Sequence, residues 1–201
     1  MNARTVIIDS GGANLSSLLF AMQRLGEPPQ LTTDAMEIRA AQRVILPGVG
    51  TARDAMQRLR DHNLVDVIRK LTQPVLGVCL GMQLLADASE EDDIDCLGII
   101  PGIAKKLISE NAHPVPNMGW CRTRHTQPHE ILHGIDDGDF FYYLHSYALP
   151  VSEFTVATAQ HASDFSAIIC RDNFCAAQFH PERSSAAGAR LLANFLRVSG
   201  I

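Results

Sequence analysis

Hydrophobic and polar positions follow two alternating patterns along the first 85 residues of the chain. Short apolar runs, of the kind buried on both faces of a sheet, predict strands at residues 6–8, 28–31, 44–46 and 75–78. Apolar residues that recur at helical spacing predict helices over residues 15–25, 36–41, 51–59 and 64–71. This alternation predicts an α/β fold: an open, mostly parallel twisted sheet with helices on both faces.

The second half of the chain has a different hydrophobic pattern, in which strand-like runs dominate. They lie at residues 97–100, 104–108, 140–144, 155–159, 167–170 and 175–179. These runs predict a mixed sheet that is antiparallel toward one edge. A last helix is expected from Ser184, and the acidic run at residues 89–95 is expected to be a solvated loop. No repeat or linker interrupts the chain, so we expect residues 1–201 to form a single domain.

Net charge and residue composition exclude several classes of function for this protein. The net charge of −5 and the lack of a Lys/Arg cluster argue against a nucleic-acid partner. The apolar run near the N-terminus is too short for a signal peptide or membrane span, so we expect no membrane contact and a cytoplasmic location. The five cysteines include no C-x-x-C pair, so we expect thiols rather than a disulfide framework or zinc ribbon. Pro128 interrupts the helical spacing of His125, His129 and His133, so we expect no metal site.

The candidate nucleophile is Cys79, at the junction between the strand at residues 75–78 and a short helix. Gly77 and Gly81 bracket it in a G-x-C-x-G pattern, and small flanking residues permit the sharp strand-to-helix turn of a nucleophile elbow. The backbone N–H groups and positive end of the helix would favour the thiolate. The alternative is that Cys79 is a small buried residue of the core.

A second candidate group is His180-Pro181-Glu182. Pro181 favours an extended conformation at His180, and residues two apart along an extended chain project to the same side. Glu182 can therefore hold one imidazole nitrogen while the other nitrogen faces a thiol, as in covalent acyl transfer. The alternative is a histidine that bonds a loop backbone beside a solvated glutamate.

Three further stretches could complete a site. The glycine turn at residues 47–50 could present a backbone N–H to an oxyanion, with Leu80 as a second donor, or could be an ordinary strand-to-helix turn. It lacks the third glycine of a dinucleotide loop, and the chain has no G-x-x-x-x-G-K-[ST] phosphate loop. Residues 145–147 could form the rim of a pocket or finish an edge strand. Residues 116–120 combine Met and the only Trp, which is typical of a docking surface but also of a core.

Six stretches of the chain match the motifs of a known family in order. They lie at residues 9–15, 46–50, 77–85, 116–120, 145–147 and 178–184. These stretches resemble the class I, triad-type glutamine amidotransferases, and most narrowly the family of glutaminase subunits of imidazole glycerol phosphate synthase. The resemblance implies a flavodoxin-like fold and a glutaminase that uses no cofactor.

The resemblance also implies a role for each matching residue. Cys79 would attack the carboxamide of L-glutamine, His180 would pass a proton to the departing ammonia, and Glu182 would orient His180. The oxyanion positions would be Gly50 and Leu80. The glutamine-binding positions would be Gln83, Ser146 and Tyr147.

The resemblance further implies a partner for this chain. Ammonia would pass to a (β/α)8 cyclase subunit in a heterodimer, which makes imidazole glycerol phosphate and an aminoimidazole carboxamide ribonucleotide in histidine biosynthesis. The positions implied at the interface are Asn14, Pro116, Met118, Trp120 and Arg183. Many members of the family have His where Asn117 stands, Asn where Cys121 stands and Lys where Arg183 stands, so details of the interface and of allosteric coupling could differ here.

Three functions remain open from the sequence. The first is a glutaminase that is nearly idle without its partner, because the glycine turn must reorganise before it can bind the oxyanion. The second is an amidotransferase that supplies a different synthase. The third is a catalytically silent subunit, against which the combination of Cys79, His180 and Glu182 argues.

Overall fold

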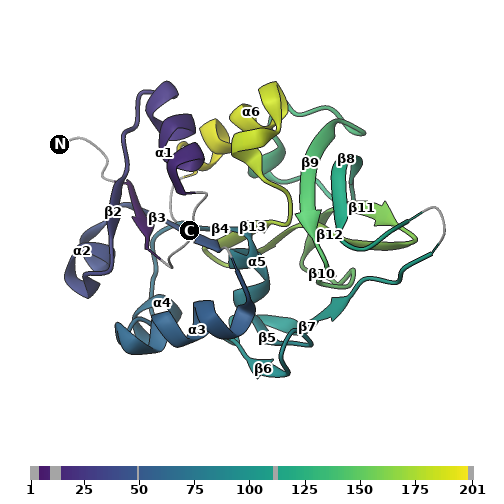
Figure 1. Cartoon of the computed structure of the whole chain (residues 1–201). Coiled ribbons are helices and arrows are strands. Elements are labelled where there is room, and N and C mark those ends of the chain that lie inside the picture. Colours follow the sequence, from purple (N-terminus) through teal and green to yellow (C-terminus); the bar gives the residue numbers. More distant parts are fainter. Residues whose placement is uncertain (1–4, 10–14, 49, 111–112, 199–201) are drawn as a thin grey trace.

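A nine-stranded sheet forms the centre of the computed structural model, which describes residues 5–9, 15–48, 50–110 and 113–198. Its strands are β1 Thr5–Ile8, β2 Gln30–Thr32, β3 Arg43–Gly48, β4 Val75–Cys79, β8 Asn117–His125, β9 Phe140–His145, β11 Thr155–His161, β12 Ser163–Arg171 and β13 Phe174–Ala177. They follow the order β2-β1-β3-β4-β13-β12-β11-β8-β9 (Figure 1).

The five strands from β2 to β13 run parallel, which confirms the predicted α/β fold. The apolar runs form β1, β3 and β4, and both β1 and β4 are buried along their whole length. β4 lies between β3 and β13, and Cys79 ends it directly opposite Gly48 of β3. Cys79 therefore lies at the carboxyl end of a central strand, where open α/β sheets usually hold their ligand sites.

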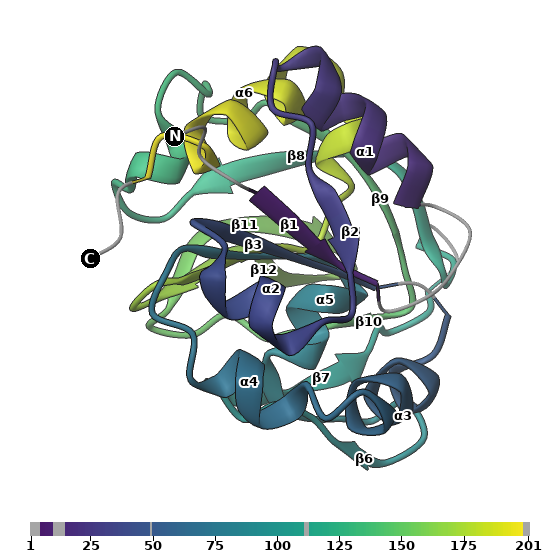
Figure 2. The same cartoon turned by 90° about the vertical axis from the view of Figure 1, so that its left-hand side faces the viewer.

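Helices cover both faces of the parallel half. They are α1 Leu15–Arg24, α2 Ala35–Ala40, α3 Ala52–Asp61, α4 Val65–Arg69, α5 Leu80–Leu84 and α6 Ser185–Phe195, with 3-10 turns η1 Glu130–Leu132 and η2 Pro181–Arg183. Figures 1 and 2 show α1 and α6 over one face and α2 to α5 over the other. Each face has its own apolar core, as Met22 and Phe195 on one side and Ile38 and Met56 on the other illustrate. Each of these buried side chains contributes roughly 1.5–3 kcal/mol by leaving water. Among the described residues, no helix has the length and apolar character needed to cross a membrane.

The other half of the large sheet is antiparallel, as predicted for one edge. Its long strand β8 was not predicted, because Gly and Arg interrupt the apolar alternation in this stretch. One face of β8 is buried at Asn117 and Thr123, whereas the other carries exposed Met118 and Trp120. His125 ends this strand and His133 follows η1, so the evenly spaced histidines share no helix.

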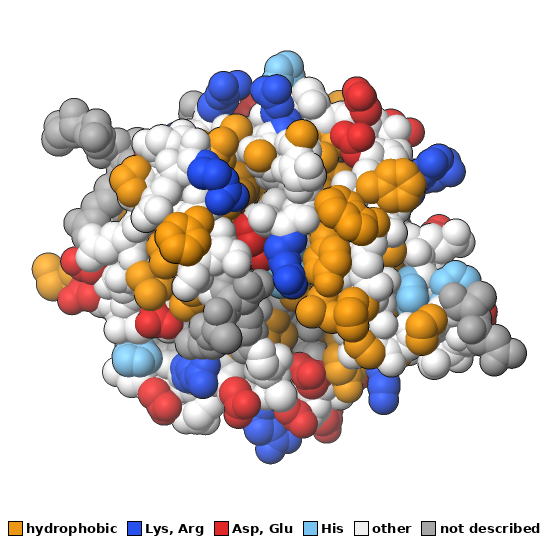
Figure 3. Space-filling view, turned by 45° about the horizontal axis from the view of Figure 1, so that its top comes forward, with side chains coloured by type: hydrophobic (Ala, Val, Ile, Leu, Met, Phe, Trp, Pro, Cys, Tyr) orange, Lys and Arg blue, Asp and Glu red, His pale blue; other side chains and the backbone are white. Residues whose placement is uncertain are grey.

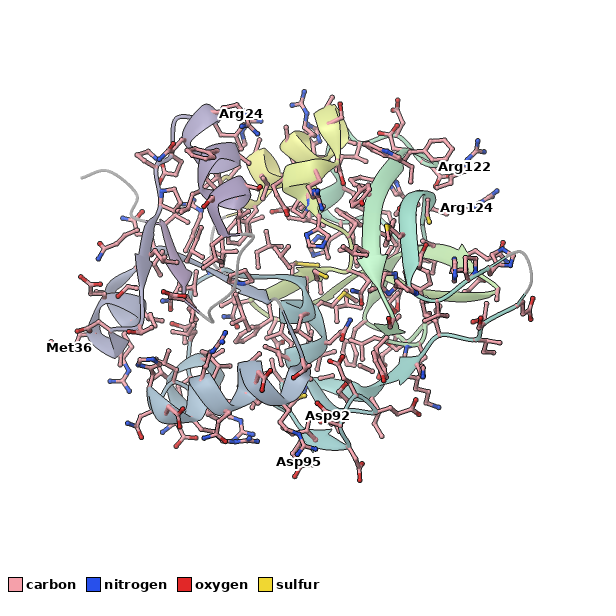
Figure 4. All side chains as sticks on the ribbon, in the orientation of Figure 1. Arg24, Met36, Asp92, Asp95, Arg122 and Arg124 are labelled. Carbon is pink, nitrogen blue, oxygen red and sulfur yellow. A yellow bond between two sulfur atoms is a disulfide. The ribbon has the colours of Figure 1, made fainter. Side chains whose placement is uncertain are left out.

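A second, smaller sheet lies beside the large mixed sheet, and it contains the part of the chain where the runs at residues 97–100 and 104–108 were predicted to join the mixed sheet. It consists of β10 Tyr147–Ala148, β7 Ile100–Lys106, β5 Ala86–Ser89 and β6 Ile94–Asp95, in that order. Because β5 begins almost directly after the short α5, the chain stays over one face of the large sheet and pairs there with β7. Of the strand predicted at residues 97–100, only Ile100 belongs to a strand, because β7 begins there. The acidic run forms the end of the β5–β6 hairpin, where Asp92 and Asp95 point away from the molecule (Figure 4).

The prediction that all five cysteines are thiols is also wrong. Cys170 of β12 and Cys175 of β13 form a disulfide, while Cys79, Cys96 and Cys121 are free. The two bonded residues lie directly opposite each other in the β12–β13 ladder. Only this register brings the side chains together, so the spacing of the cysteines along the chain could not reveal the pair.

Candidate active site

Cys79 lies at the sharp turn between β4 and α5. Its backbone has φ 54° and ψ −112°, a conformation that costs a residue with a side chain about 1–3 kcal/mol. Gly81 makes the turn possible, because an added Cβ would overlap the carbonyl oxygen of Leu46 in β3. An added Cβ at Gly48 would lie 2.7 Å from the Cβ of Leu80, which is also too close. Close packing of α5 on β3 therefore holds the sulfur at the end of the sheet.

His180 and Glu182 come from the segment that follows β13. His180 Nδ1 and Glu182 Oε1 are 2.9 Å apart, and both side chains are almost fully buried. Burial alone would lower the pKa of His180. Hydrogen bonds to Cys79 and Glu182, together with the negative charges of both, outweigh burial and raise the pKa of His180 to about 10. The imidazole therefore holds a proton between the sulfur of Cys79 and a carboxylate, which is the geometry of a nucleophile, a proton carrier and an orienting group.

Ser184 fixes the backbone of His180 against β9. Its hydroxyl donates to the carbonyl oxygen of His180 at 2.6 Å and accepts the N–H of Tyr142 at 2.9 Å. The N–H of His180 donates in turn to the carbonyl oxygen of Tyr142 at 2.9 Å. Ser184 is fully buried, so water does not compete for these bonds. Nothing in the sequence pattern pointed to this role, because the bonds depend on β9 lying beside the segment.

A cavity of about 290 Å³ opens beside Cys79. All five residues predicted to bind the oxyanion and glutamine line it: Gly50, Leu80, Gln83, Ser146 and Tyr147. The wall is completed by Glu91, Pro116, Leu144 and His145. Glu91 was expected in a solvated loop, but its carboxylate accepts the N–H of Ala52 at 2.8 Å, which holds the β5–β6 hairpin against the start of α3.

Gln83 is almost fully buried behind the cavity and links several elements. Its side-chain Nε2 donates to the carbonyl oxygen of Tyr147 at 2.8 Å and to Oε1 of Gln178 at 3.2 Å. The side-chain nitrogen of Gln178 lies 4.0 Å from the sulfur of Cys79. These contacts join α5, β10 and the segment before His180 into one wall, which the sulfur of Cys79 contacts.

A buried polar chain runs from β8 to the same wall. Asn117 Nδ2 lies 3.1 Å from His145 Nε2, and His145 Nδ1 lies 2.9 Å from the carbonyl oxygen of Tyr147. Burial lowers the pKa of His145 to about 4, so the ring is neutral. Because the amide nitrogen of Asn117 can only donate, Nε2 of His145 accepts and Nδ1–H donates to Tyr147. Cys121 donates to Oδ1 of Asn117 at 3.4 Å and thereby orients the amide.

The outer side of β8 and β9 presents an aromatic cluster to solvent. Met118 and Trp120 are 64% and 52% exposed. The ring of Trp120 meets that of Tyr142 edge-on at 6.1 Å, and the guanidinium of Arg183 lies 5.0 Å above the Tyr142 ring. Figure 3 shows hydrophobic side chains gathered on this part of the surface. Three of the residues predicted at a partner interface, Met118, Trp120 and Arg183, therefore share one exposed face.

Of the other two predicted interface residues, the structure describes only one. Pro116 lies on the wall of the cavity beside Cys79, and Asn14 is outside the described residues. At the predicted glycine turn, Gly50 has φ +85°, and an added Cβ there would meet no atom within 4 Å. The glycine is therefore required by the backbone conformation rather than by lack of space.

Comparisons with known proteins identify the family to which this chain belongs. The family model of the class-I glutamine amidotransferases matches residues 6–198. The chain is 50% identical over 192 residues to imidazole glycerol phosphate synthase subunit HisH 2 of Legionella pneumophila strain Paris, covering 96% of each chain. It is 48% identical over 196 residues to subunit HisH of Pectobacterium atrosepticum, covering 97% of this chain and 100% of that one.

Solved structures show the same fold at low sequence identity. A protein from Thermoplasma acidophilum, described as part of a putative GMP synthase, matches with a TM-score of 0.76 and 17% identity, over 98% of this chain and 94% of the other. The glutaminase domain of Trypanosoma brucei CTPS matches with a TM-score of 0.61 and 16% identity, over 100% and 96%. The chain therefore belongs to the class-I glutamine amidotransferases and, among them, to the HisH subunits of imidazole glycerol phosphate synthase.

Proposed function

We propose that this chain is a glutaminase that hydrolyses L-glutamine to glutamate and ammonia and delivers the ammonia to a cyclase subunit in histidine biosynthesis. The observation that carries the proposal is the placement of Cys79 between two features. One is the buried His180–Glu182 pair, and the other is a cavity walled by every predicted glutamine-binding residue. Membership of the HisH family supports the same activity.

The reaction proceeds through a covalent thioester. The thiolate of Cys79 attacks the carboxamide carbon, the C–N bond breaks, and the imidazolium of His180 gives its proton to the departing ammonia. His180 then takes a proton from water, which attacks the thioester and releases glutamate and the thiolate. Glu182 keeps the imidazole ring oriented through both steps. The backbone N–H groups of Gly50 and Leu80 bind the oxyanion.

The remaining cavity residues recognise the amino-acid end of glutamine. Glu91 brings a carboxylate to the wall, which is complementary to the α-ammonium group. Ser146 and Tyr147, two adjacent residues that also line the cavity, hold the α-carboxylate, and Gln83 maintains the position of Tyr147. These groups provide nucleophile, acid, base and orientation, so the reaction needs no cofactor.

The exposed cluster of Met118, Trp120 and Arg183 is the docking surface for the cyclase subunit, with Pro116 and Asn14 as further contacts. An interface with aromatic and Arg anchors is typical of specific complexes. The cyclase would join ammonia to its nucleotide substrate and release imidazole glycerol phosphate and aminoimidazole carboxamide ribonucleotide. A heterodimer in the cytoplasm stays a prediction of this proposal.

The decisive experiment measures glutamine hydrolysis by the chain alone and with the cyclase subunit and its nucleotide ligand. We expect stimulation of about tenfold or more on adding partner and ligand. Cys79→Ser should remove activity in both states by about 10³-fold or more. Stimulation by a different synthase would identify another acceptor. Ammonia release that survives Cys79→Ser would contradict the proposed mechanism, and inactivity under every condition would identify a silent subunit.

A further inference from the structure

A thiol and imidazole cluster lies at the end of β12 and β13 that is opposite to the elbow. Cys170 and Cys175 face each other across the two strands, and Cys175 is three ladder positions before the level of Cys79. His129, from the loop before η1, places Nδ1 3.8 Å from the sulfur of Cys170. The potential ligand atoms of these three residues all lie within 4.8 Å of one another. In the part of the chain that the structure describes, this is the only such group of three.

Rigid elements hold the cluster in place. Asn173, in the turn between β12 and β13, donates to the carbonyl oxygens of Leu71 and Gln73 at 3.0 and 2.8 Å. Its own carbonyl oxygen accepts the N–H of Val75 at 2.9 Å, which fixes the hairpin to the start of β4. His129 is held at the start of η1, where its Nδ1 accepts the N–H of Ile131 at 3.1 Å. The three side chains therefore start from defined positions.

A cavity of about 340 Å³ opens next to the cluster and gives it access to solvent. His129 and Cys175 line it, together with the carboxylate-bearing residues Glu130 and Asp172. A metal ion held by the three residues would thus have a fourth position open toward water or toward one of these carboxylates. That arrangement matches the four-coordinate preference of zinc.

We propose that His129, Cys170 and Cys175 form a binding site for a thiophilic divalent cation, Zn²⁺, when the cysteine pair is reduced. Two sulfur ligands and one imidazole are the ligand set that zinc prefers. A sulfur and a nitrogen bound to one tetrahedral zinc are roughly 3.5 Å apart, close to the separation of Cys170 Sγ and His129 Nδ1. Coordination by the imidazole replaces one hydrogen bond, the one from Ile131.

The disulfide and the metal site are alternative states of the same two sulfurs. A dithiol reductant converts the disulfide to two thiols and becomes a disulfide itself, so two electrons and two protons are transferred. Zn²⁺ then binds the two thiolates and releases both protons to solvent. Oxidation by a small-molecule disulfide reverses the sequence and expels the ion.

The test is zinc titration of the reduced full-length chain against a chromophoric chelator, with Co²⁺ absorption reporting bonds from sulfur to metal. The Cys79→Ser background removes the other thiol that lies beside a histidine. We expect the reduced chain to bind one equivalent of Zn²⁺. The affinity for Zn²⁺ should fall about 100-fold or more in Cys170→Ser or Cys175→Ser and about tenfold in His129→Ala. Cys121→Ser is the matched control, since this thiol lies on the same large sheet outside the cluster, and it should keep the full equivalent.

Oxidised protein provides a test that needs no substitution in the cluster. The chain with its Cys170–Cys175 disulfide intact should bind no zinc, and reduction should restore the equivalent. Absence of binding in the reduced chain would overturn the proposal and leave a structural disulfide. Binding that survives in the Cys170→Ser/Cys175→Ser double variant, or that is unchanged by His129→Ala, would also overturn it.

Discussion

Two residues at the site, Cys79 and His180, adopt a backbone conformation and a protonation state that are unfavourable in isolation and that neighbouring residues stabilise. Cys79 keeps a left-handed backbone because α5 is packed against β3 through Gly48 and Gly81. His180 keeps its proton in a buried position because the sulfur of Cys79 and the carboxylate of Glu182 lie on either side of it. In both cases the free-energy cost falls on one residue, whereas the contacts that offset it come from several surrounding elements.

Replacing Glu182 by Gln removes the charge that helps to raise the pKa of His180 while keeping the size of the side chain. We expect the alkaline limb of the kcat/KM profile, set by loss of the His180 proton near pH 10, to move to lower pH. Turnover should fall by about 10²- to 10⁴-fold because the ring is no longer held. Glutamate release by the complex between about pH 6 and pH 11 measures both effects. An unchanged alkaline limb would show that Glu182 does not act on His180.

The proton on His180 also links stability to pH. Its pKa is about 10 in the folded chain and 6.5 as the ordinary value, so the folded state binds this proton more tightly. The stabilisation is fully present below pH 6.5 and is lost as pH rises toward 10. Urea unfolding across this pH interval should show that the free energy of unfolding falls less in Glu182→Gln than in the unsubstituted chain. Equal losses would assign the pH dependence to other groups.

Gly81→Ala should destabilise the whole domain, because the new methyl group would overlap the carbonyl oxygen of Leu46. We expect a loss of about 3 kcal/mol or more in the free energy of unfolding, measured by urea denaturation. Gly50→Ala is the matched control, since its methyl group meets no atom and only the positive φ opposes it. That variant should lose about 1–2 kcal/mol. Similar losses in both variants would argue against the close packing of α5 on β3.

At the scale of elements, the two faces of β8 contact two different surroundings, solvent on one side and the interior beside the cavity on the other. Its outer face carries Met118 and Trp120, whereas inward-facing Asn117 reaches the glutamine cavity through His145. A strand is stiff along its length, so a partner that shifts the outer residues would also move the inner one. The alternation of side chains along one strand thus offers a short physical route between the two surfaces.

Asn117→Leu keeps the branched shape of the side chain but removes the donor to His145 Nε2. His145 then no longer favours the tautomer that donates to Tyr147, and the cavity wall loses its support. We expect the KM for glutamine to rise about tenfold, with a smaller change in kcat. Arg124→Ala is the control, because this side chain projects outward from the same strand (Figure 4). A fall in kcat at constant KM would place Asn117 in the chemistry rather than in the wall.

At the scale of the whole molecule, the site is assembled from distant parts of the chain. Cys79 ends β4, His180 follows β13, and Ser146 and Tyr147 follow β9. Glu91 reaches the cavity from the small sheet. The exposed cluster around Trp120 lies on β8 and β9, next to the segment that carries His180. A partner on this surface therefore contacts elements that also form the site.

Trp120→Ala should weaken the complex with the cyclase subunit, because a large aromatic side chain at the centre of an interface supplies much of its binding energy. We expect the concentration of cyclase needed for half-maximal stimulation to rise about 10- to 100-fold. Met36→Ala is the control: this residue is 78% exposed on α2, far from β8 in Figure 4. An unchanged concentration for Trp120→Ala would place the interface on another surface.

The sequence allowed prediction of the features that depend on local pattern. Apolar runs and helical spacing indicated the parallel half of the sheet, and the glycines around Cys79 indicated the elbow. The separate small sheet and β8 were not predicted, because strands of mixed composition lack a clear period. The single domain over residues 1–201 stays a prediction.

By itself, the sequence determined the class of the fold, and it predicted Cys79 as the nucleophile and His180 as its histidine from residue types at short spacing. Only the tertiary structure decided which distant groups meet. It placed Glu91 at the cavity, Ser184 under His180, Asn117 behind Tyr147, and Cys170 opposite Cys175. The physical reason is that strand order and register set these contacts, and both are fixed by packing of the whole chain rather than by any short stretch of it.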